Sequence, residues 1–452
     1  MGDSAMEENH SDPQAAESPE QPSSHFRVLE APTRLWVPCT AHASPDEMHF
    51  KPAGTLVAVG ESLIENDAGF GNTPLAPAAS HIVDTGRVTL TNGSEVPAVL
   101  LETIESAATP GGFSPISTEA VAGTLSGLGT AALRINIERL RGGGVWADRW
   151  TSPDLLGQLH ACITNPPDIV LCNLLDADRA VAINQACARE YPAEIVAAVA
   201  ALARLTGAGR AWAAVDADQD TAAWIGMRAV AAQVAGDLRF VPIENHYPQP
   251  DPTLLLHSLT GRRLRPGQLP TSQGVLLLDA AAAFGVGRAL VLGESMLRVP
   301  LAVHDRVALA VNADPAAATH LVIVPVGSPL RDILHHLDVG HGRRGLDLWA
   351  GAPLRERRLA SHCVIAGGEL GIFAAPRDPS INPDPCIRCG WCVEGCPVDA
   401  QPAALLDAAQ RADPRRAARY GLDVCIECGI CSYVCPSHLP LLQGIRILRG
   451  ER

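Results

Sequence analysis

The chain has 452 residues, of which 47% are apolar and only 4% aromatic. This length predicts about three domains, with cores built mainly from aliphatic side chains. The formal net charge of −14 argues against a nucleic-acid-binding surface, which needs clustered positive charge. Lys51 is the single lysine of the chain. A GK[ST] phosphate loop is therefore excluded, and only this residue could form a Schiff base.

Residues 1–25 are predicted to be a disordered acidic tail. The first 24 residues hold six acidic side chains and no Lys or Arg, and they are rich in Ser, Pro and Gln. They lack a basic region followed by an apolar core, so no signal peptide is expected. No run of about 18 uncharged apolar residues occurs. We therefore expect a cytoplasmic chain that reaches a membrane only through partner subunits.

Two larger domains should follow the tail. Residues 26–108 are predicted to be all-β, because short apolar runs alternate with Gly, Asn and Asp, and residues 91–93 (TNG) suit a tight hairpin turn. In residues 109–298, helical stretches such as 193–209 alternate with short buried strands such as 168–173. This alternation predicts an α/β domain with some parallel strands.

The remaining chain is predicted to contain three smaller parts. Residues 299–345 suggest a small module of strands and a helix, and residues 346–380 suggest a connector. Residues 381–445 carry the cysteine motifs described next. Two helices are expected between the motifs, the second with Asp413 as its N-cap and Pro414 at its first position.

Eight of the 13 cysteines form two phrases with the spacing C-x2-C-x2-C-x3-C-P. The first consists of Cys386, Cys389, Cys392 and Cys396, and the second of Cys425, Cys428, Cys431 and Cys435. In two-cluster ferredoxins with this spacing, the fourth cysteine of each phrase ligates the other cluster. We therefore expect one [4Fe-4S] cluster on Cys386, Cys389, Cys392 and Cys435, and another on Cys425, Cys428, Cys431 and Cys396.

Other metal or disulfide interpretations of the cysteines are less favoured, and the remaining cysteines and the paired histidines are expected to have structural roles. Zinc sites usually show paired C-x2-C units, and disulfides are not expected without a secretory signal. The five remaining cysteines should be buried small hydrophobes: Cys39, Cys162, Cys172, Cys187 and Cys363. His335 and His336 are adjacent on an expected helix and point in different directions, which favours a surface role over metal ligation. Tyr433 should pack over a cluster.

The cysteine region, CIRCGWCVEGCP to CIECGICSYVCP, resembles the RnfC family of the Rnf electron-transport complex. The resemblance continues upstream. LWVPCTAHAS with AGTLVAVGESLI is similar to the family's N-terminal β segment, and the stretch from YPQPDPTLLLHSLTGR to GVLLLDAAAA is similar to part of its α/β domain. VPVGSPLRDIL is similar to its β-grasp module. Together these segments cover roughly residues 30–445 in the family's order.

The resemblance implies a fold and a set of partners. The fold would be multidomain α/β plus β: a barrel-sandwich-like N-terminal segment, a Rossmann-like α/β domain, a small β-grasp (SLBB-like) module and a ferredoxin-like 2×[4Fe-4S] domain. The partners would be other subunits of a membrane-bound electron-transport complex, with the chain peripheral at the inner face of the cell membrane. In the family, the α/β domain also implies an FMN site that accepts hydride from NADH.

The stretches that correspond to the flavin site depart from the family pattern. The glycine-rich loop reads RGGGVWAD (141–148), with Val145 and Ala147 in place of a glycine and a proline. The acidic turn reads NLLDADR (173–179), in which Asp176 and Asp178 replace glutamates. Leu278 or Asp279 stands where an asparagine is expected. A bulky side chain in a phosphate-binding loop obstructs close backbone approach, so FMN and NADH binding is in doubt. An ordinary turn and a solvated helix start are the alternatives.

Three functions remain open from the sequence. The first is a relay subunit whose two clusters carry electrons between a donor at the α/β domain and a partner subunit. The second is an FMN-dependent NADH dehydrogenase subunit that feeds the same clusters. The third is a scaffold without ligands whose β modules hold partners together.

Overall fold

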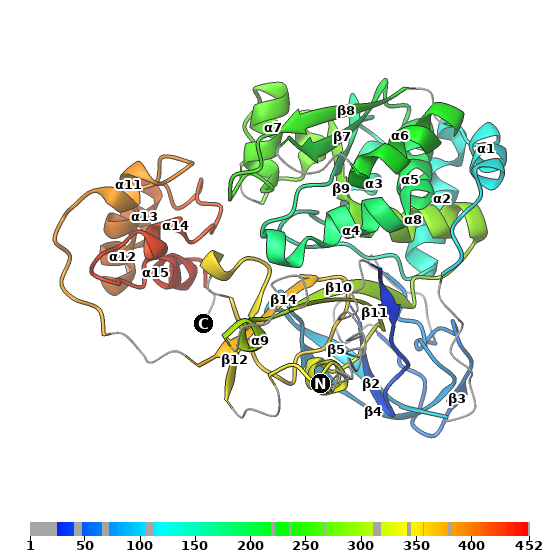
Figure 1. The fold of residues 1–452 in the computed structure, drawn as a ribbon, viewed down its shortest axis with the longest axis horizontal. Coiled ribbons are helices and arrows are strands. Elements are labelled where there is room, and N and C mark those ends of the chain that lie inside the picture. Colours follow the sequence, from blue (N-terminus) through cyan, green and yellow to red (C-terminus); the bar gives the residue numbers. More distant parts are fainter. Residues whose placement is uncertain are drawn as a thin grey trace, which may run out of the picture.

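The computed structural model shows two large units packed together and a small helical unit at one end (Figure 1). The residues that it describes are 25–39, 48–65, 72–104, 113–217, 222–234, 237–265, 267–310, 318–340, 345–355, 357–377 and 382–450. Except for its last residue, the predicted acidic tail lies outside them. Within the described residues the strands form three sheets.

The first sheet is antiparallel and lies within the N-terminal region that the sequence predicts to be all-β. Its strands lie in the order β2 (Arg34–Pro38), β5 (Glu95–Thr103), β4 (Ser80–Thr89) and β3 (Leu56–Val57). β4 and β5 form a hairpin in which Thr89 and Glu95 are the pair next to the turn. The turn contains Gly93 at φ +84°. The Gly93 N–H donates to the Leu90 carbonyl at 2.9 Å, which closes the predicted hairpin.

The second sheet is parallel and confirms the predicted α/β layering. Its strands lie in the order β8 (Leu238–Ile243), β7 (Arg210–Asp216), β6 (Ile169–Asn173) and β9 (Val275–Asp279). The helices of this unit are α1 (Thr118–Ser126), α2 (Leu133–Gly142), α3 (Leu155–Cys162), α4 (Ile183–Glu190), α5 (Pro192–Thr206), α6 (Ala222–Val234), α7 (Pro252–Thr260) and α8 (Ala280–Leu292).

Helices α5 and α8 form the centre of the α/β unit. Both are rich in alanine and almost entirely buried. At Gly287 a Cβ atom would lie 2.1 Å from the Glu194 carbonyl oxygen, so only glycine permits this close approach of the two helices. α8 also contacts β10 of the third sheet, and the buried side chains of the two units form one continuous core.

The third sheet corrects the expected domain boundaries. Its strands lie in the order β1 (Arg27–Val28), β11 (Thr319–Pro325), β10 (Arg298–Asp305), β14 (Gly371–Pro376), β12 (Leu346–Ala350) and β13 (Arg358–Leu359). Two short helices, α9 (Arg306–Ala310) and α10 (Leu330–His336), accompany it. The expectation that residues 346–380 form a connector is therefore wrong. β14 is buried along most of its length because it pairs with β10 on one side and with β12 on the other.

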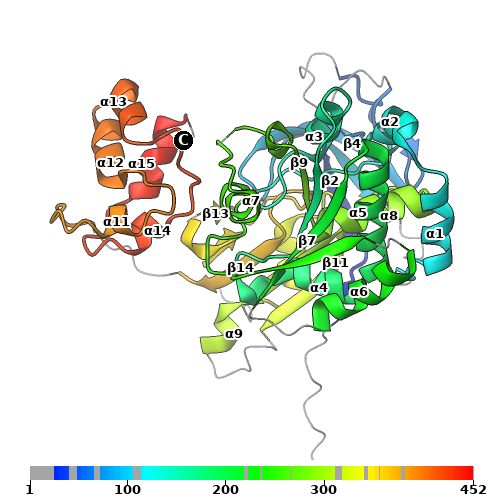
Figure 2. The same cartoon turned by 90° about the horizontal axis from the view of Figure 1, so that it is seen from above.

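The cysteine region forms the small helical unit, which lies beside α7 in both views (Figures 1 and 2). Its helices are α11 (Trp391–Glu394), α12 (Pro402–Gln410), α13 (Pro414–Arg419), α14 (Ile430–Tyr433) and α15 (Leu441–Leu448). The two helices predicted between the cysteine phrases are α12 and α13. The Asp413 carboxylate accepts a hydrogen bond from the Arg416 N–H, as expected for an N-cap.

Candidate iron–sulfur site and the flavin-type region

Four cysteines from both phrases meet around one small cavity. A cavity of about 20 Å³ is lined by Cys425, Cys428 and Cys431 of the second phrase and by Cys396 of the first. Burial, and to a smaller extent the charges of Cys425 and Cys396, raises the pKa of the Cys428 thiol to about 12. Thiolates so placed repel one another, and a cationic iron–sulfur centre relieves that repulsion. The donor set therefore fits the second predicted cluster.

Of the other four cysteines, Cys389, Cys392 and Cys435 lie near one another. Burial and the charges of Cys435 and Cys389 raise the pKa of the Cys392 thiol, although a backbone hydrogen bond from Ala403 opposes this. Cys392 also packs in the same apolar cluster as Cys435. Cys389 and Cys386 are exposed.

Two hydrogen bonds tie the start of the first phrase to the end of the second. The Asp384 N–H donates to the Ser437 carbonyl at 3.0 Å, and the Ser437 hydroxyl donates to the Pro385 carbonyl at 3.0 Å. The segment just before Cys386 therefore lies beside the segment just after Cys435. This interleaving is what exchanged ligands require, since each fourth cysteine must reach the other repeat.

The two phrases share an unusual backbone conformation. Arg388 and Glu427, at equivalent positions, both have positive φ, and so do the glycines that follow the second cysteine of each phrase. Asp399 and His438, each three residues after a fourth cysteine, repeat the same feature. Non-glycine residues adopt positive φ only where the surroundings impose it. The repeats are thus two copies of one structural unit.

The second phrase is packed against the rest of the protein. The Tyr247 hydroxyl donates to the Cys428 carbonyl at an O–O distance of 2.5 Å. A Cβ atom at Gly429 would lie 1.5 Å from the Leu354 carbonyl oxygen, so the two backbones are in direct contact. The Arg446 guanidinium donates to the Arg355 carbonyl at 2.8 Å.

A cluster of aromatic and charged side chains supports this contact. The Trp150 and Tyr247 rings lie 5.8 Å apart, and the Arg355 guanidinium stacks 4.8 Å above the Trp150 ring. Arg355 also forms a buried ion pair with Glu369 at 2.8 Å. No sequence motif points to these residues, except that YPQP, which contains Tyr247, belongs to the family resemblance.

Glu427 of the second phrase is held by two arginines near the C-terminal end of α15. It pairs with Arg446 at 3.2 Å and also with Arg449. Burial would raise the pKa of Glu427, but the two guanidinium groups outweigh it and keep the pKa below the ordinary value. The charged side chain at this position is thus neutralised within the chain.

The glycine-rich loop at 142–145 does not present free amides. It follows the C-terminus of α2, and its N–H groups are used to close that helix end. Gly143 donates to the Arg139 carbonyl at 2.9 Å, Gly144 to the Arg141 carbonyl at 3.1 Å and Val145 to the Leu140 carbonyl at 3.0 Å. The Val145 side chain is fully buried. The observed role is thus a helix-ending turn, as the alternative interpretation predicted.

The residues of the acidic turn are also engaged within the protein. Asn173 donates to the Pro250 carbonyl at 3.1 Å and accepts from the Leu175 N–H at 3.1 Å. Asp176 accepts hydrogen bonds from the two N–H groups at 184 and 185, at the start of α4. Asp178 accepts from the Ala180 N–H. The expected helix start is present, but Asp176 is buried there, so the expectation that it is solvated is wrong.

A buried ion pair lies at the end of β9, where the family has an asparagine. Asp279 accepts from Arg149 Nη2 at 2.5 Å and from Nε at 2.6 Å, and it accepts from the Thr151 hydroxyl at 3.1 Å. Arg149 also donates to the Gly367 carbonyl at 2.9 Å. No sequence motif points to Arg149, although a buried aspartate after a strand indicates that a cation must neutralise it. Because its expected polar groups are already paired, this region does not fit FMN.

The remaining candidates have structural roles. All five scattered cysteines are buried, as predicted. Burial raises the pKa of Cys39 to about 12, which makes it inert. His335 and His336 are exposed at the end of α10. Tyr433 is 73% exposed, and its packing over a cluster stays a prediction. Within the described part of the chain, no three His, Cys, Asp or Glu side chains converge on a single-ion site.

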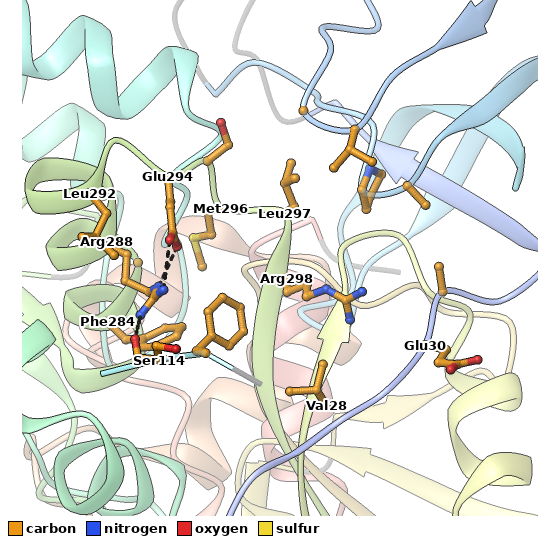
Figure 3. Close-up of a pocket in the computed structure, with 18 of the residues that line it drawn as sticks. Val28, Glu30, Ser114, Phe284, Arg288, Leu292, Glu294, Met296, Leu297 and Arg298 are labelled. Atoms are coloured by element: carbon orange, nitrogen blue, oxygen red, sulfur yellow. Dashed lines mark hydrogen bonds and ion pairs between the residues drawn. The ribbon is translucent and has the colours of Figure 1, made fainter. Parts of the chain in front are cut away.

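A cavity of about 1,010 Å³ lies between the antiparallel sheet and α8 (Figure 3). Its wall is largely apolar and includes Phe284 and Met296. Three of its charged groups are already engaged: Arg288 pairs with Glu294 at 2.8 Å, and Arg298 donates to the Leu29 carbonyl at 2.6 Å. No group lining the cavity identifies a ligand.

Comparisons with known proteins agree with the cysteine region and with the α/β layering. Residues 158–288 match the family model described as the Nuo51 FMN-binding domain, and residues 378–436 match the 4Fe-4S dicluster domain. The chain resembles the C subunits of ion-translocating oxidoreductase complexes. It is 26% identical over 288 residues to the protein of Pasteurella multocida, 26% over 207 residues to that of Buchnera aphidicola and 27% over 266 residues to that of Rhodobacter capsulatus. The resemblance expected from the sequence motifs is therefore confirmed.

These matches cover only part of each protein. They cover 62%, 44% and 58% of this chain, but only 32%, 41% and 49% of the respective relatives. Among solved structures, an NAD+-reducing [NiFe]-hydrogenase in the H2-reduced state aligns with a TM-score of 0.47 at 16% identity, covering 75% of this chain and 64% of that one. This likeness is too low to bear on function. None of the described helices is long and apolar enough to span a bilayer.

Proposed function

We propose that this chain is an electron-transfer subunit of an Rnf-type redox complex, with two [4Fe-4S] clusters held in its C-terminal unit. The observation that carries the proposal is the meeting of Cys396 with Cys425, Cys428 and Cys431 around one cavity. Bound clusters would supply one-electron transfer, for which no acid–base residue is needed. The cysteines hold the clusters, and the surrounding protein sets their exposure and their contacts.

The ligand sets follow from the interleaving of the phrases. Cys396 joins the three cysteines of the second phrase up to Cys431, and Cys435 joins those of the first up to Cys392. The second set lies against the α/β unit through the Tyr247 contact, and two members of the first set, Cys386 and Cys389, are exposed to solvent. A relay built in this way connects a donor at the α/β unit with a partner subunit on the opposite side.

The donor is not an FMN held at the expected loop, because that loop and the acidic turn are consumed by internal hydrogen bonds. The alternative of an FMN-dependent NADH dehydrogenase is favoured by the family match at residues 158–288. That match lies downstream of the glycine-rich loop, so it is not evidence that the loop binds phosphate.

The finer architecture belongs to the same proposal. We assign the antiparallel sheet, which begins at Arg34, to a barrel-sandwich-like segment and the parallel sheet with its helices to a Rossmann-like domain. The β-grasp module includes β10 and β11, as anticipated from the resemblance, and extends to β12 and β14. The partners are other subunits of a membrane-bound complex, with this chain peripheral at the inner face of the cell membrane.

Anaerobic purification with quantification of iron, sulfide and flavin tests the proposal. We expect iron and sulfide in the amounts of two [4Fe-4S] clusters per chain and flavin far below one per chain. Flavin near one per chain would favour the dehydrogenase instead. A chain free of iron after anaerobic purification would leave only the scaffold.

A further inference from the structure

The two cysteine phrases, although similar in sequence and backbone, differ in what covers them. In the second phrase Ile426 is 7% exposed, and its equivalent in the first phrase, Ile387, is 67% exposed. The second phrase is covered by α15 and by the contacts with Tyr247 and Leu354 described above. The first phrase presents the equivalent face to solvent.

The exposed face of the first phrase is apolar. Trp391 is 54% exposed and Val393 is 44% exposed, and both belong to α11. Tyr433 of α14, which packs against α11, is 73% exposed. With Ile387 these form what we call the α11 patch: Ile387, Trp391, Val393 and Tyr433. In both views α11 lies on the side of the unit away from α7 (Figures 1 and 2). Large apolar side chains exposed on the first phrase and on the helix that contacts it are typical of an interaction site.

The two phrases also differ in the charge that they carry at equivalent positions. Glu427 in the second phrase is neutralised by two arginines of the same chain. Its equivalent, Arg388, is exposed and has the opposite sign. A surface that covers the first phrase as this chain covers the second must therefore supply a carboxylate to Arg388.

We propose that the α11 patch is the docking surface for a redox-partner protein that carries a carboxylate opposite Arg388. This inference rests on the proposed function and adds the residues through which the partner is recognised. A second copy of this chain suits the surface less well, because a symmetric contact would place Arg388 near its own copy. Exposure of Cys386 and Cys389 in the same face places the first ligand set next to the partner.

Amide hydrogen exchange in the free holoprotein and in the complex purified from membranes through a tag on this chain tests the proposal. We expect residues 425–431 to be protected in both samples and residues 386–395 to become protected only in the complex. Equal exchange of 386–395 in both samples would overturn the proposal. Protection that instead appears in the isolated chain as its concentration rises would also overturn it, in favour of self-association.

Variants test the docking surface independently, and their iron content shows whether the clusters remain bound. We expect Trp391→Ser and Arg388→Glu to weaken retention of the partner by roughly tenfold or more, as for central interface residues. Iron per chain and the rate of oxidation by ferricyanide should stay unchanged. Ile135→Ser, which changes a 71% exposed side chain on α2, is the matched control. Unchanged retention in both patch variants would refute the docking surface, whereas an iron-free wild-type chain would refute the proposed function itself.

Discussion

The cysteine unit and the flavin-type region of the α/β unit respond differently to sequence change. In the cysteine unit every donor of the family pattern is present, and the structure brings Cys396 beside the second phrase. In the flavin-type region the corresponding polar groups bind one another. Asp279 pairs with Arg149, and Asp176 caps α4. One region keeps its donors for a ligand, and the other has used them for its own stability.

This difference follows from what each region must neutralise. Clustered thiols are of little use to a fold without iron, because their mutual repulsion and desolvation are costly. Carboxylates and amides, in contrast, can be satisfied by a nearby guanidinium or helix end. A flavin site can therefore turn into a packed structural region through a few substitutions, whereas a cluster site is either kept or lost.

The largest effects are expected at the cysteines, where the exchanged ligation can be broken directly. Cys396→Ser should remove one cluster and about half of the iron, since a cluster that loses one of its four ligands is unstable. The double variant Cys396→Ser/Cys425→Ser should lose no more iron than the single one. Cys396→Ser/Cys386→Ser should lose nearly all of it. Iron analysis of the anaerobically purified variants distinguishes these outcomes. The reverse pattern, with the 396/386 pair behaving like a single variant, would show that each phrase closes its own cluster.

The buried ion pair of the α/β unit should show the next largest effect. Arg149→Ala leaves Asp279 buried without a partner, so we expect the free energy of unfolding to fall by about 3–5 kcal/mol. Urea denaturation of the holoprotein measures this. The exposed Arg134→Ala on α2 is the matched control and should change stability by less than about 0.5 kcal/mol. A loss as small as that of the control would show that Asp279 is solvated, and gain of flavin by Arg149→Ala would show that the pair closes a functional site.

These regions also show what the sequence can predict. The spacing of the cysteines predicts the ligands because each phrase is contiguous, and the alternation of helices and strands predicts the parallel sheet. The Arg149–Asp279 pair joins residues 130 positions apart, and no local pattern indicates it. The same holds for β14, whose short apolar run by itself suggests a connector although β10 and β12 bury it. Pairing between distant segments depends on the tertiary structure and is not encoded in any single stretch.

A pH-dependent effect is expected at Asp176. Burial raises the pKa of Asp176 to about 8, against the opposing hydrogen bonds from Asn184 and Gln185. In the unfolded chain the pKa is about 4, so between about pH 4 and pH 8 the folded state retains a proton that the unfolded state has lost. Stability should therefore fall as the pH rises through this window, by at most about 1.4 kcal/mol per pH unit.

Asp176→Asn separates this titration from the rest of the chain. The amide does not titrate, so the variant should be less stable than the wild type near pH 5, and the gap should narrow toward pH 8. Urea midpoints at the two pH values measure the gap. Asp178, two residues away, caps a helix at a less buried position. Asp178→Asn is therefore the control, and its stability should change with pH as steeply as that of the wild type. A gap that is constant with pH would mean that Asp176 is ionised throughout.

The smallest effect is expected where the two regions meet. Tyr247→Phe removes the hydrogen bond to the Cys428 carbonyl but keeps the ring against Trp150, so the contact between the units should weaken by about 1 kcal/mol. Iron content should not change, because Tyr247 is not a ligand. Amide exchange of residues 425–431 should become several-fold faster, while that of 386–392, which this contact does not cover, should stay the same. Equal acceleration of both phrases would mean that Tyr247 stabilises the cysteine unit as a whole. The comparison of a covered and an uncovered repeat would then not hold.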